Sequence, residues 1–531
     1  MHVKNRIICL VLCIFSLAAS MFLLVDTVKK DMPEINRGEK KEEVVDPILP
    51  SVDFESEKTQ LSETGVSAFA LRVQNFVTRL AYEEDKSFET ERDYIIENAK
   101  NVAGWLLEKG DASGSEYLLQ VAQMFEKSKI EFSSDEAFGE SVSRILSDID
   151  TSFETVSQNE NLSLYPVFDT EVGGELTLAL LSIHLAQAKG DGSTTFILSV
   201  GGGALLGDRL GTENEGSFKQ MYDGSKYAFP MYKLSSVLKN DDMSFITLLA
   251  PLTESAESEV LDPVKGSPEY AKGLLGVDCV SVAPFEIMDY GEAGYQDTLT
   301  TLSNNSISYS VHNGSSFKDT AFGKVVYITF DLTDTPVTDE QKDKNKEVVK
   351  SAVQTERENG ADLIVVMLNW NTRLRKSDDF SADYKGDEVS VYEQHFDAYN
   401  KEIARAAIGD GVTGANLVVG TGAHVIQGIE NYKGRMIVYS PGDVTFSLPV
   451  DREKPNTAYS FIFTQTFEKT ENGIESKDFR VIPFVNTSVD EPFTPTPVFD
   501  SRADSIIDIL RYRSSYFADP LTEFNYIKIE K

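Results

Sequence analysis

The sequence predicts an α/β protein, in which a layered α/β/α domain follows a small helical domain and one long apolar segment. Three observations support this prediction. Apolar, β-rich runs alternate with helix-like runs between residues 191 and 500, helical spacing of apolar residues dominates 63–190, and residues 7–25 carry no charge. In layered α/β domains the loops at the strand ends carry the chemistry, so the functional residues are expected there.

The apolar run at residues 7–25 (IICLVLCIFSLAASMFLLV) approaches the ~20 residues that a helix needs to cross the hydrocarbon core of a membrane. Lys4 and Arg6 precede it and Asp26 follows it, which favours a cytoplasmic N-terminus and an extracytoplasmic remainder. We therefore expect a single-pass signal-anchor in the cell membrane of a bacterial-type envelope. A cleavable secretory signal is the alternative, because residues 18–20 are small, and it would yield a secreted protein.

The segments after the anchor differ in composition. Residues 29–62 are rich in Glu, Lys, Pro and Asp with little apolar periodicity, which is typical of a flexible linker. Helical periodicity follows, with Gly110 placed to end a helix, and His184 is expected to be a packed or half-exposed residue and not a ligand. The predicted segments are 1–28, the anchor; 29–62, the linker; 63–190, the helical domain; 191–500, the α/β domain; and 501–531, a C-terminal helix and tail.

Within the α/β domain the apolar runs predict the individual elements. Strands are expected at 196–200, 245–249, 277–282, 325–330, 363–368, 417–419 and 437–439. Helices are expected at 232–238, 269–275, 293–302, 344–357 and 392–408.

Charge and cysteine usage exclude some classes of function. With 50 basic against 85 acidic residues the net charge is −35, which repels phosphate backbones and argues against a nucleic-acid partner. Cys9 and Cys13 lie inside the apolar run, so Cys279 is left alone and no intramolecular disulfide is expected in the exported part. Its setting, VDCVSV, predicts a core cysteine in a strand.

Six motifs occur in an order and at spacings that resemble one family. They are ILSVGGGALLGDR, YAFPMYKLSSVLKNDDMSFITLLAPLT, LLGVDCVSVAPFEIMDYGEAGYQDTLTTL, ADLIVVMLNWN, GANLVVGTGAHVIQGIENYKGRMIVYSPGDVTF and VIPFVN. The segment from about residue 195 to 499 thereby resembles the capsule-synthesis CapA family, poly-γ-glutamate capsule proteins with a metallophosphatase-like fold. The resemblance implies that fold and a role in capsule or poly-γ-glutamate biosynthesis.

The resemblance also implies which positions would bind metal. In a metallophosphatase-like site, Asp, Asn, Glu and His side chains from several loops hold one or two divalent ions, which generate hydroxide near neutral pH. Most of these positions lack a donor here, whereas turn and packing positions such as Asp242, Tyr290, Gly420 and Gly442 fit the family. The ligand positions are occupied by Gly203, Thr247, Leu249, Pro284, Phe285, Glu286, Asn369, Gly422, His424 and Asp443.

A retained scaffold without its metal ligands suggests a catalytically degenerate pseudoenzyme, which would bind or scaffold an envelope polymer or an envelope protein. We expect no metal or other cofactor, and we assign no catalytic residue. The candidates for a vestigial site are His424, Glu286, Asp289, Asp443 and Trp370. A purely structural role is the simpler interpretation for these residues. His424 would then hydrogen-bond to backbone groups, and the carboxylates of Glu286, Asp289 and Asp443 would cap loops.

Two alternatives stay open. An active metal-dependent hydrolase or ligase-like enzyme could hold Mn, Fe or Zn in a site rebuilt from Glu286, Asp289, His424 and Asp443. The helical domain could instead be the working part, recruiting an envelope partner.

A basic cluster follows the Asn369-Trp370-Asn371 loop. Arg373, Arg375 and Lys376 would offset the global negative charge at the mouth of the former site, and they are candidates for contact with an anionic polymer.

Overall fold

A computed structural model describes residues 192–529, except for 210–216, 226–228, 259, 261–262, 284, 333–337, 371–397, 447–457, 472 and 488–491. It also describes 131, 133–144, single helical positions between 96 and 126, and 181, 184 and 185. The predicted anchor at 7–25, the linker and the basic cluster Arg373, Arg375 and Lys376 lie outside these residues. Within the described stretches, we find no helix with the length and apolarity needed to cross a membrane.

The first of two large sheets has seven strands in the order β15-β14-β13-β1-β3-β5-β6. The strands β1, β3, β5 and β6 run parallel, while β13, β14 and β15 add an antiparallel part beside β1. Their bounds are β1 (Thr195–Ala204), β3 (Met243–Leu248), β5 (Cys279–Val282), β6 (Ser308–Val311), β13 (Tyr459–Thr470), β14 (Gly473–Val485) and β15 (Thr496–Pro497).

The second sheet has six strands in the order β11-β12-β10-β9-β8-β7. Its centre is parallel and both edge strands are antiparallel to their neighbours. The bounds are β7 (Gly314–Thr320), β8 (Gly323–Asp331), β9 (Leu363–Asn369), β10 (Leu417–Thr421), β11 (Ile429–Tyr432) and β12 (Arg435–Val438). A small sheet pairs β2 (Asp208–Arg209) with β4 (Val264–Lys265).

The two large sheets pack face to face over one apolar core. Side chains alternate along each strand, so Val325 and Tyr327 of β8 join this core while Val326 and Ile328 point to the opposite face. The rings of Tyr327 and Phe245 lie 5.3 Å apart and connect the second sheet to the first.

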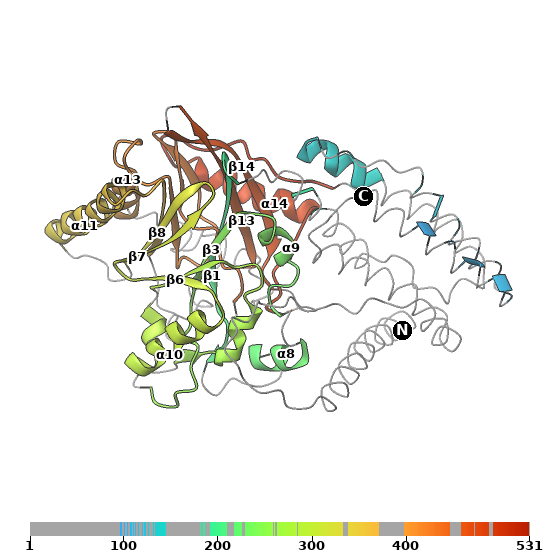
Figure 1. Ribbon diagram of the computed structural model, residues 1–531, viewed down its shortest axis with the longest axis horizontal. Helices are drawn as coiled ribbons and strands as arrows, with labels where there is room; N and C mark the ends of the chain where they lie inside the picture. The colour runs from blue at the N-terminus through green and yellow to red at the C-terminus, as the bar shows by residue number, and fades with distance from the viewer. Residues whose placement is uncertain are drawn as a thin grey trace, which may run out of the picture. The chain divides into compact units, whose positions relative to one another are not determined.

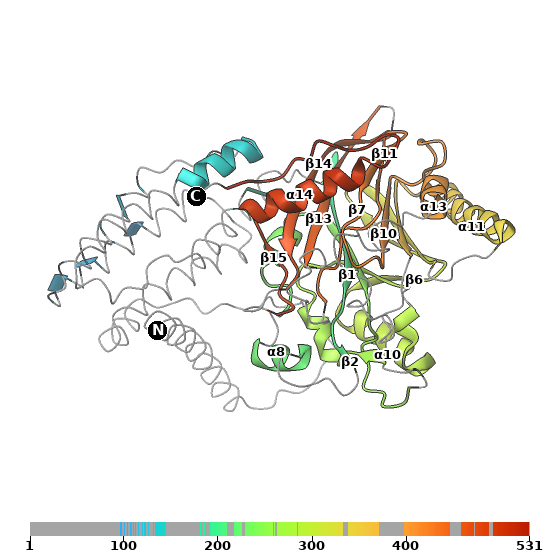
Figure 2. The ribbon, with the colours of Figure 1, turned by 180° about the vertical axis from the view of Figure 1, so that it is seen from behind.

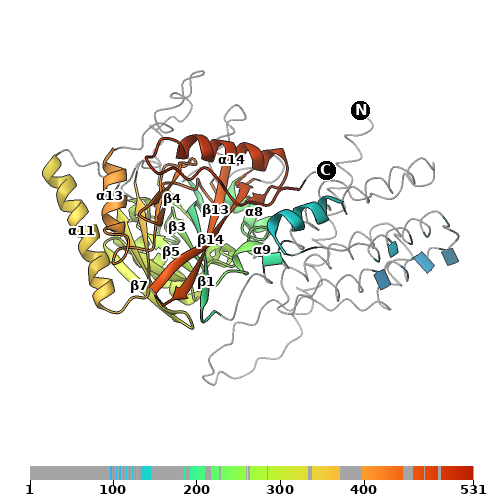
Figure 3. The same cartoon turned by 90° about the horizontal axis from the view of Figure 1, so that it is seen from above.

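Helices cover the outer faces. The outer face of the six-stranded sheet packs against α11 (Asp339–Glu358) and α13 (Ala398–Ile408), which lie side by side in Figures 1 and 3. In Figure 2, α14 (Ser501–Ser514) crosses β13 and β14, and its apolar side chains belong to the core. The other helical segments are α8 (Phe218–Ser225), α9 (Ser235–Leu238), α10 (Gly291–Asn304) and the 3-10 turns η3 (Pro268–Gly273) and η4 (Phe285–Met288).

All seven predicted strands are present, and Cys279 is a free, buried residue of β5 as predicted. The layering differs, because two stacked sheets stand where one sheet was predicted. The predicted helix at 232–238 is a turn followed by the four residues of α9, and that at 269–275 is the 3-10 turn η3, which begins at Pro268. Residues 392–397 of another predicted helix lie outside the described residues, and its remainder includes α13.

Described positions of the predicted helical region are helical at residues 135–144, and Gly110 has a left-handed φ of 86°, as its predicted role at a helix end requires. Asp135, the first residue of the helix at 135–144, is 7% exposed and accepts two hydrogen bonds of 2.7 Å from the Arg480 guanidinium on β14. His184 Nε2 lies 2.7 Å from the same carboxylate, so this histidine is packed and hydrogen-bonded, as expected.

The cost of burying Asp135 opposes ionisation, but the bonds from His184 and Arg480 overcome it and lower the carboxyl pKa to about 2. The Asp135–Arg480 pair therefore connects the helix to the first sheet through a desolvated charge pair.

We predict that Asp135→Asn costs about 3 kcal/mol of unfolding free energy in urea titrations, because it leaves the Arg480 charge buried and unpaired. Glu468→Gln is the matched control, since Glu468 pairs with Lys477 at an exposed site, and its cost should stay below about 1 kcal/mol.

The depressed pKa adds a pH test. Stability from Asp135 is present above the unfolded pKa near 3.8 and is lost as the pH falls towards about 2. Equal losses in the two variants, or the same acid sensitivity in Asp135→Asn and in the parent, would contradict the assignment.

Candidate functional site

The predicted site positions gather where strands of both sheets end. Gly203 is near the end of β1, Thr247 near that of β3, and Asn369 ends β9. The loop after β12 crosses onto β1, because Val444 N–H donates to the Gly203 carbonyl at 2.6 Å. Residues from distant parts of the sequence are thus brought to one edge.

His424 and Asp443 form a buried pair at this edge. The His424 Nδ1 atom lies 2.9 Å from Asp443 Oδ2, and the two residues are 4% and 2% exposed. The Asp443 carbonyl accepts hydrogen bonds from the Ser460 hydroxyl at 2.7 Å and the Asn486 amide at 3.2 Å, which hold the aspartate in place. The expectation that His424 bonds backbone is not met for Nδ1, which pairs with a carboxylate.

The electrostatics of His424 follow from this pairing. Burial alone would lower the pKa of the imidazole, but the charge and hydrogen bond of Asp443, together with the charge of Glu286, raise it above the ordinary 6.5. His424 has a left-handed φ of 59°, and its ring lies 4.9 Å from that of Phe446. The pair is therefore a desolvated acid–base unit beside an aromatic side chain.

The other two candidate carboxylates have different settings. Glu286, in η4, is 5% exposed and acts electrostatically on His424. Asp289 Oδ2 accepts the Val264 N–H at 3.0 Å and so holds β4, close to the loop-capping role considered above. Burial raises the pKa of Asp289 to about 6, against the lowering effects of the Val264 bond and Arg209.

Gly203 and Leu249 occupy complementary space. A Cβ atom on Gly203 would lie 2.5 Å from Leu249 Cδ1 and 2.7 Å from Asp443 Oδ1, inside any normal contact distance. Leu249 is buried and clusters with Leu205, Ala250 and Val264. The leucine therefore fills the space that a side chain at position 203 would need.

A chain of hydrogen-bonded polar side chains, which ends on the Asp331 carboxylate, runs beside these apolar residues. Thr247 Oγ1 donates to Thr421 Oγ1, Thr421 Oγ1 to Asn369 Oδ1, and Asn369 Nδ2 to Asp331 Oδ1, each at 3.4 Å. Thr247 and Asn369 are two of the positions at which the resemblance implies metal ligands. Here these side chains hydrogen-bond to one another in long, weak contacts.

Trp370 serves packing. The side chain is 1% exposed, stacks on Tyr439 with ring centroids 5.8 Å apart, and leaves no room for a Cβ on Gly420, which would lie 2.1 Å from Trp370 Cζ2. A buried indole in this position stabilises the end of β9 and does not offer a ligand.

The described residues do not fit the metal centre that the resemblance implies. No three His, Cys, Asp or Glu side chains among them are placed to share an ion. The donor chemistry agrees, because Gly203, Thr247 and Leu249 supply no carboxylate or imidazole.

The sequence indicated His424, Glu286 and Asp443, but it did not show which side chains fill the space around them. Leu249 and Phe446 are ordinary apolar residues, and only their contacts with Gly203 and His424 reveal what they do. One signal was available, since a glycine and a leucine stand at two positions where the family pattern has carboxylates.

We predict that Gly203→Ala costs about 1–3 kcal/mol of unfolding free energy by overpacking against Leu249. In a Leu249→Ala background the same change should cost clearly less, because the clash with Leu249 is then removed and only the one with Asp443 Oδ1 remains. A double-mutant cycle measured by urea denaturation checks this, and additive effects would contradict the contact.

We predict that Asp443→Asn lowers the pKa of His424, since Asp443 is the main group that raises it. A histidine with a raised folded pKa adds stability below the unfolded pKa, and this stability is lost as the pH rises through the folded pKa. The variant should lose that pH dependence, with the imidazole titrated by NMR. An unchanged His424 titration would refute the assignment, and His312, which is exposed, is an internal reference.

Comparison with known proteins finds one family model that matches part of the chain. Residues 329–448 match the family model of the bacterial capsule synthesis protein PGA_cap. No curated protein sequence matches the chain.

Solved structures give distant matches. The calcineurin-like phosphoesterase YfkN from Bacillus subtilis is 10% identical, with a TM-score of 0.30, over 55% of this chain and 90% of that one. GAP50, the anchor in the inner membrane complex of Plasmodium, is 11% identical, with a TM-score of 0.29, over 60% and 95%. The resemblance to capsule synthesis proteins that the motifs indicated is confirmed by the family match, which runs from the end of β8 to the loop beyond β12.

Proposed function

We propose that this chain is a membrane-anchored, extracytoplasmic relative of capsule synthesis proteins that has lost the metal chemistry and acts as a binding or scaffolding module at the cell envelope. The family match over residues 329–448 supports the capsule connection. The observation that carries the loss of chemistry is the complementary packing of Gly203 and Leu249.

This packing distinguishes a position that merely lacks a metal-binding side chain from one whose space another side chain has filled. If Gly203 alone had replaced an acidic residue, a cavity or a water site would be expected, and one substitution could restore the donor. Leu249 occupies that space, so an aspartate at 203 would collide with it. Two changes are then needed before a carboxylate can reach the edge, which favours a stable, non-catalytic state.

The placement in the cell rests on the sequence. The apolar run at residues 7–25 is long enough to span a membrane, and the charges around it favour an extracytoplasmic remainder. With cleavage after the small residues 18–20, the same module would be secreted.

Two kinds of partner fit an envelope module. The proposed contact for an anionic polymer is Arg373, Arg375 and Lys376, because the net charge of −35 would otherwise repel such a chain. The second kind of partner is an envelope protein, which residues 63–190 would recruit.

One observation favours a rival function, a metal-dependent hydrolase with a rebuilt site. His424 and Asp443 remain paired at 2.9 Å, and Glu286 is close enough to raise the imidazole pKa. Asp289 is a weaker member, because its carboxylate holds the Val264 N–H. This set provides one imidazole and two buried carboxylates.

We predict that the full chain, purified in detergent, retains no stoichiometric Mn, Fe or Zn and does not hydrolyse bis(p-nitrophenyl) phosphate or a γ-glutamyl polymer. Elemental analysis and product release are the measurements. His424→Ala and the exposed control His312→Ala should behave like the parent.

Stoichiometric metal with turnover, both removed by His424→Ala and kept by His312→Ala, would establish the rival hydrolase.

A further inference from the structure

A pocket lies along β6, near the corner where the two sheets meet. The last strand of one sheet, β6, leads through His312 and Asn313 into β7, the last strand of the other. Asn313 N–H donates to the Thr329 carbonyl at 2.9 Å, and Asp331 N–H donates to His312 Nδ1 at 2.8 Å. These bonds fix the corner, and a hollow of about 490 Å³ opens beside it.

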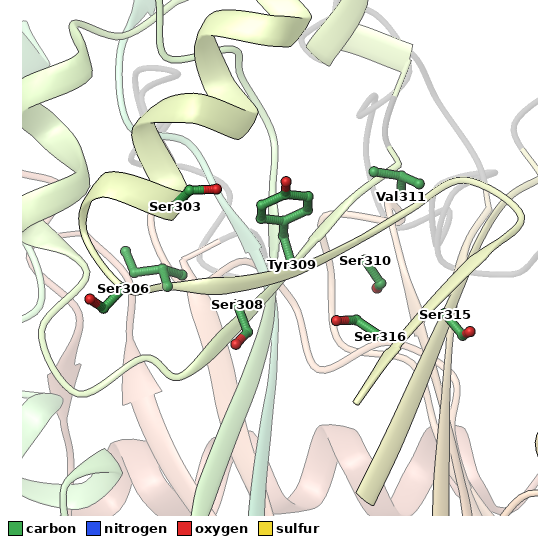
Figure 4. A pocket seen from close by; sticks show the side chains of 9 residues that line it. Ser303, Ser306, Ser308, Tyr309, Ser310, Val311, Ser315 and Ser316 are labelled. Atoms are coloured by element: carbon green, nitrogen blue, oxygen red, sulfur yellow. The ribbon is translucent and has the colours of Figure 1, made fainter. Parts of the chain in front are cut away.

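Hydroxyl groups dominate the lining of this hollow. Figure 4 shows the Tyr309 side chain on one side of β6, with Ser308 and Ser310 on the other. Two apolar residues and no charged side chain are among the residues that line it. The serines are Ser303, Ser306, Ser308, Ser310, Ser315 and Ser316.

Some of these hydroxyls already have protein partners. Ser303 Oγ donates to the Leu299 carbonyl at 2.9 Å, and Ser310 bonds Thr329. Ser315 Oγ donates to the Glu356 carboxylate at 2.6 Å, so its lone pairs remain available as acceptors. Within the described part of the chain, the hydroxyls of Ser306 and the half-buried Tyr309 make no recorded hydrogen bond.

We propose that this hollow binds a neutral sugar. Hydroxyl groups donate and accept hydrogen bonds, as sugar hydroxyls do, and the Tyr309 ring offers an apolar surface beside them. The volume lies in the range of small-molecule sites. The Glu356 carboxylate next to Ser315 and the net charge of −35 both disfavour an anionic ligand. A cationic ligand is also disfavoured, because no carboxylate is among the residues that line the hollow.

An extended peptide added to the free edge of β6 is the competing occupant. Strand addition gains affinity from main-chain hydrogen bonds. With four residues, β6 offers few outward-facing peptide groups for such bonds, whereas hydroxyls surround the hollow. The sugar is therefore the better match.

The experiment titrates the full-length protein with glucose, N-acetylglucosamine and cellobiose, followed by saturation-transfer difference NMR and calorimetry. Glucuronate is the matched anionic probe for glucose, and a capped Val-Ser-Val peptide tests strand addition. We expect at least one neutral sugar to bind, and glucose-type ligands to bind better than glucuronate.

Tyr309→Ala should weaken sugar binding about tenfold by removing the aromatic surface. Ser303→Trp, at the exposed end of α10, should fill the hollow and abolish binding. Tyr512→Ala is the control, because Tyr512 is 55% exposed on α14 and should leave binding unchanged. Thermal melts verify that the variants are folded.

Absence of binding by every neutral sugar, preference for glucuronate or the peptide, or full binding by both pocket variants would each overturn the proposal. Because none of the residues that line the pocket belongs to the candidate site at the Gly203 edge, the metal and hydrolysis assays test the proposed function independently of this result.

Discussion

The close contact between β1 and the loop after β12 is the constraint on which the candidate site depends. Gly202 leaves room only for a hydrogen atom, since a Cβ there would lie 1.8 Å from the Gly442 carbonyl oxygen. Gly442 itself has a left-handed φ of 81°, which glycine adopts without strain. With this contact in place, Asp443 points towards His424, and Val444 bonds β1. A substitution at Gly202 or Gly442 would therefore displace Asp443 from its position beside His424.

The sequence allowed much of the fold to be predicted, because apolar runs such as those of β8 and β9 are local signals of buried parallel strands. The stacking of two sheets was not predicted, since it depends on which face of β8 meets Phe245 across the core, and spacing along the chain does not contain that information. The hairpin of β13 and β14 was missed for a similar reason, as its strands combine a buried half with an exposed half.

The candidate site, like the fold, could be predicted only in part from the sequence. The glycine at 203 and the leucine at 249 showed that two donors are missing, and motif order indicated the edge where they would meet. The sequence could not show that the two residues fill one another's space, nor that Asp443 pairs with the retained histidine, because both facts are distances between atoms of different strands. The substitution of two donor positions of the family pattern is therefore visible in the sequence, whereas the packing of Leu249 against Gly203 is visible only in a structure.

If the metals have been lost, as we propose, the coupled packing of Gly203 and Leu249 gives a physical reason why the scaffold would persist without them. A bound ion stabilises the folded state of a metalloprotein, so losing it removes part of the folding free energy. Leucine burial at the same edge replaces some of that loss, at about 25 cal/mol for each Å² of apolar surface removed from water. It also avoids gathering several carboxylates that would repel one another without a cation between them. In a chain with a net charge of −35, an edge held in part by Leu249, Thr247 and Asn369 has less of that repulsion. The two buried carboxylates that remain, Asp443 and Glu286, both act on the His424 imidazole.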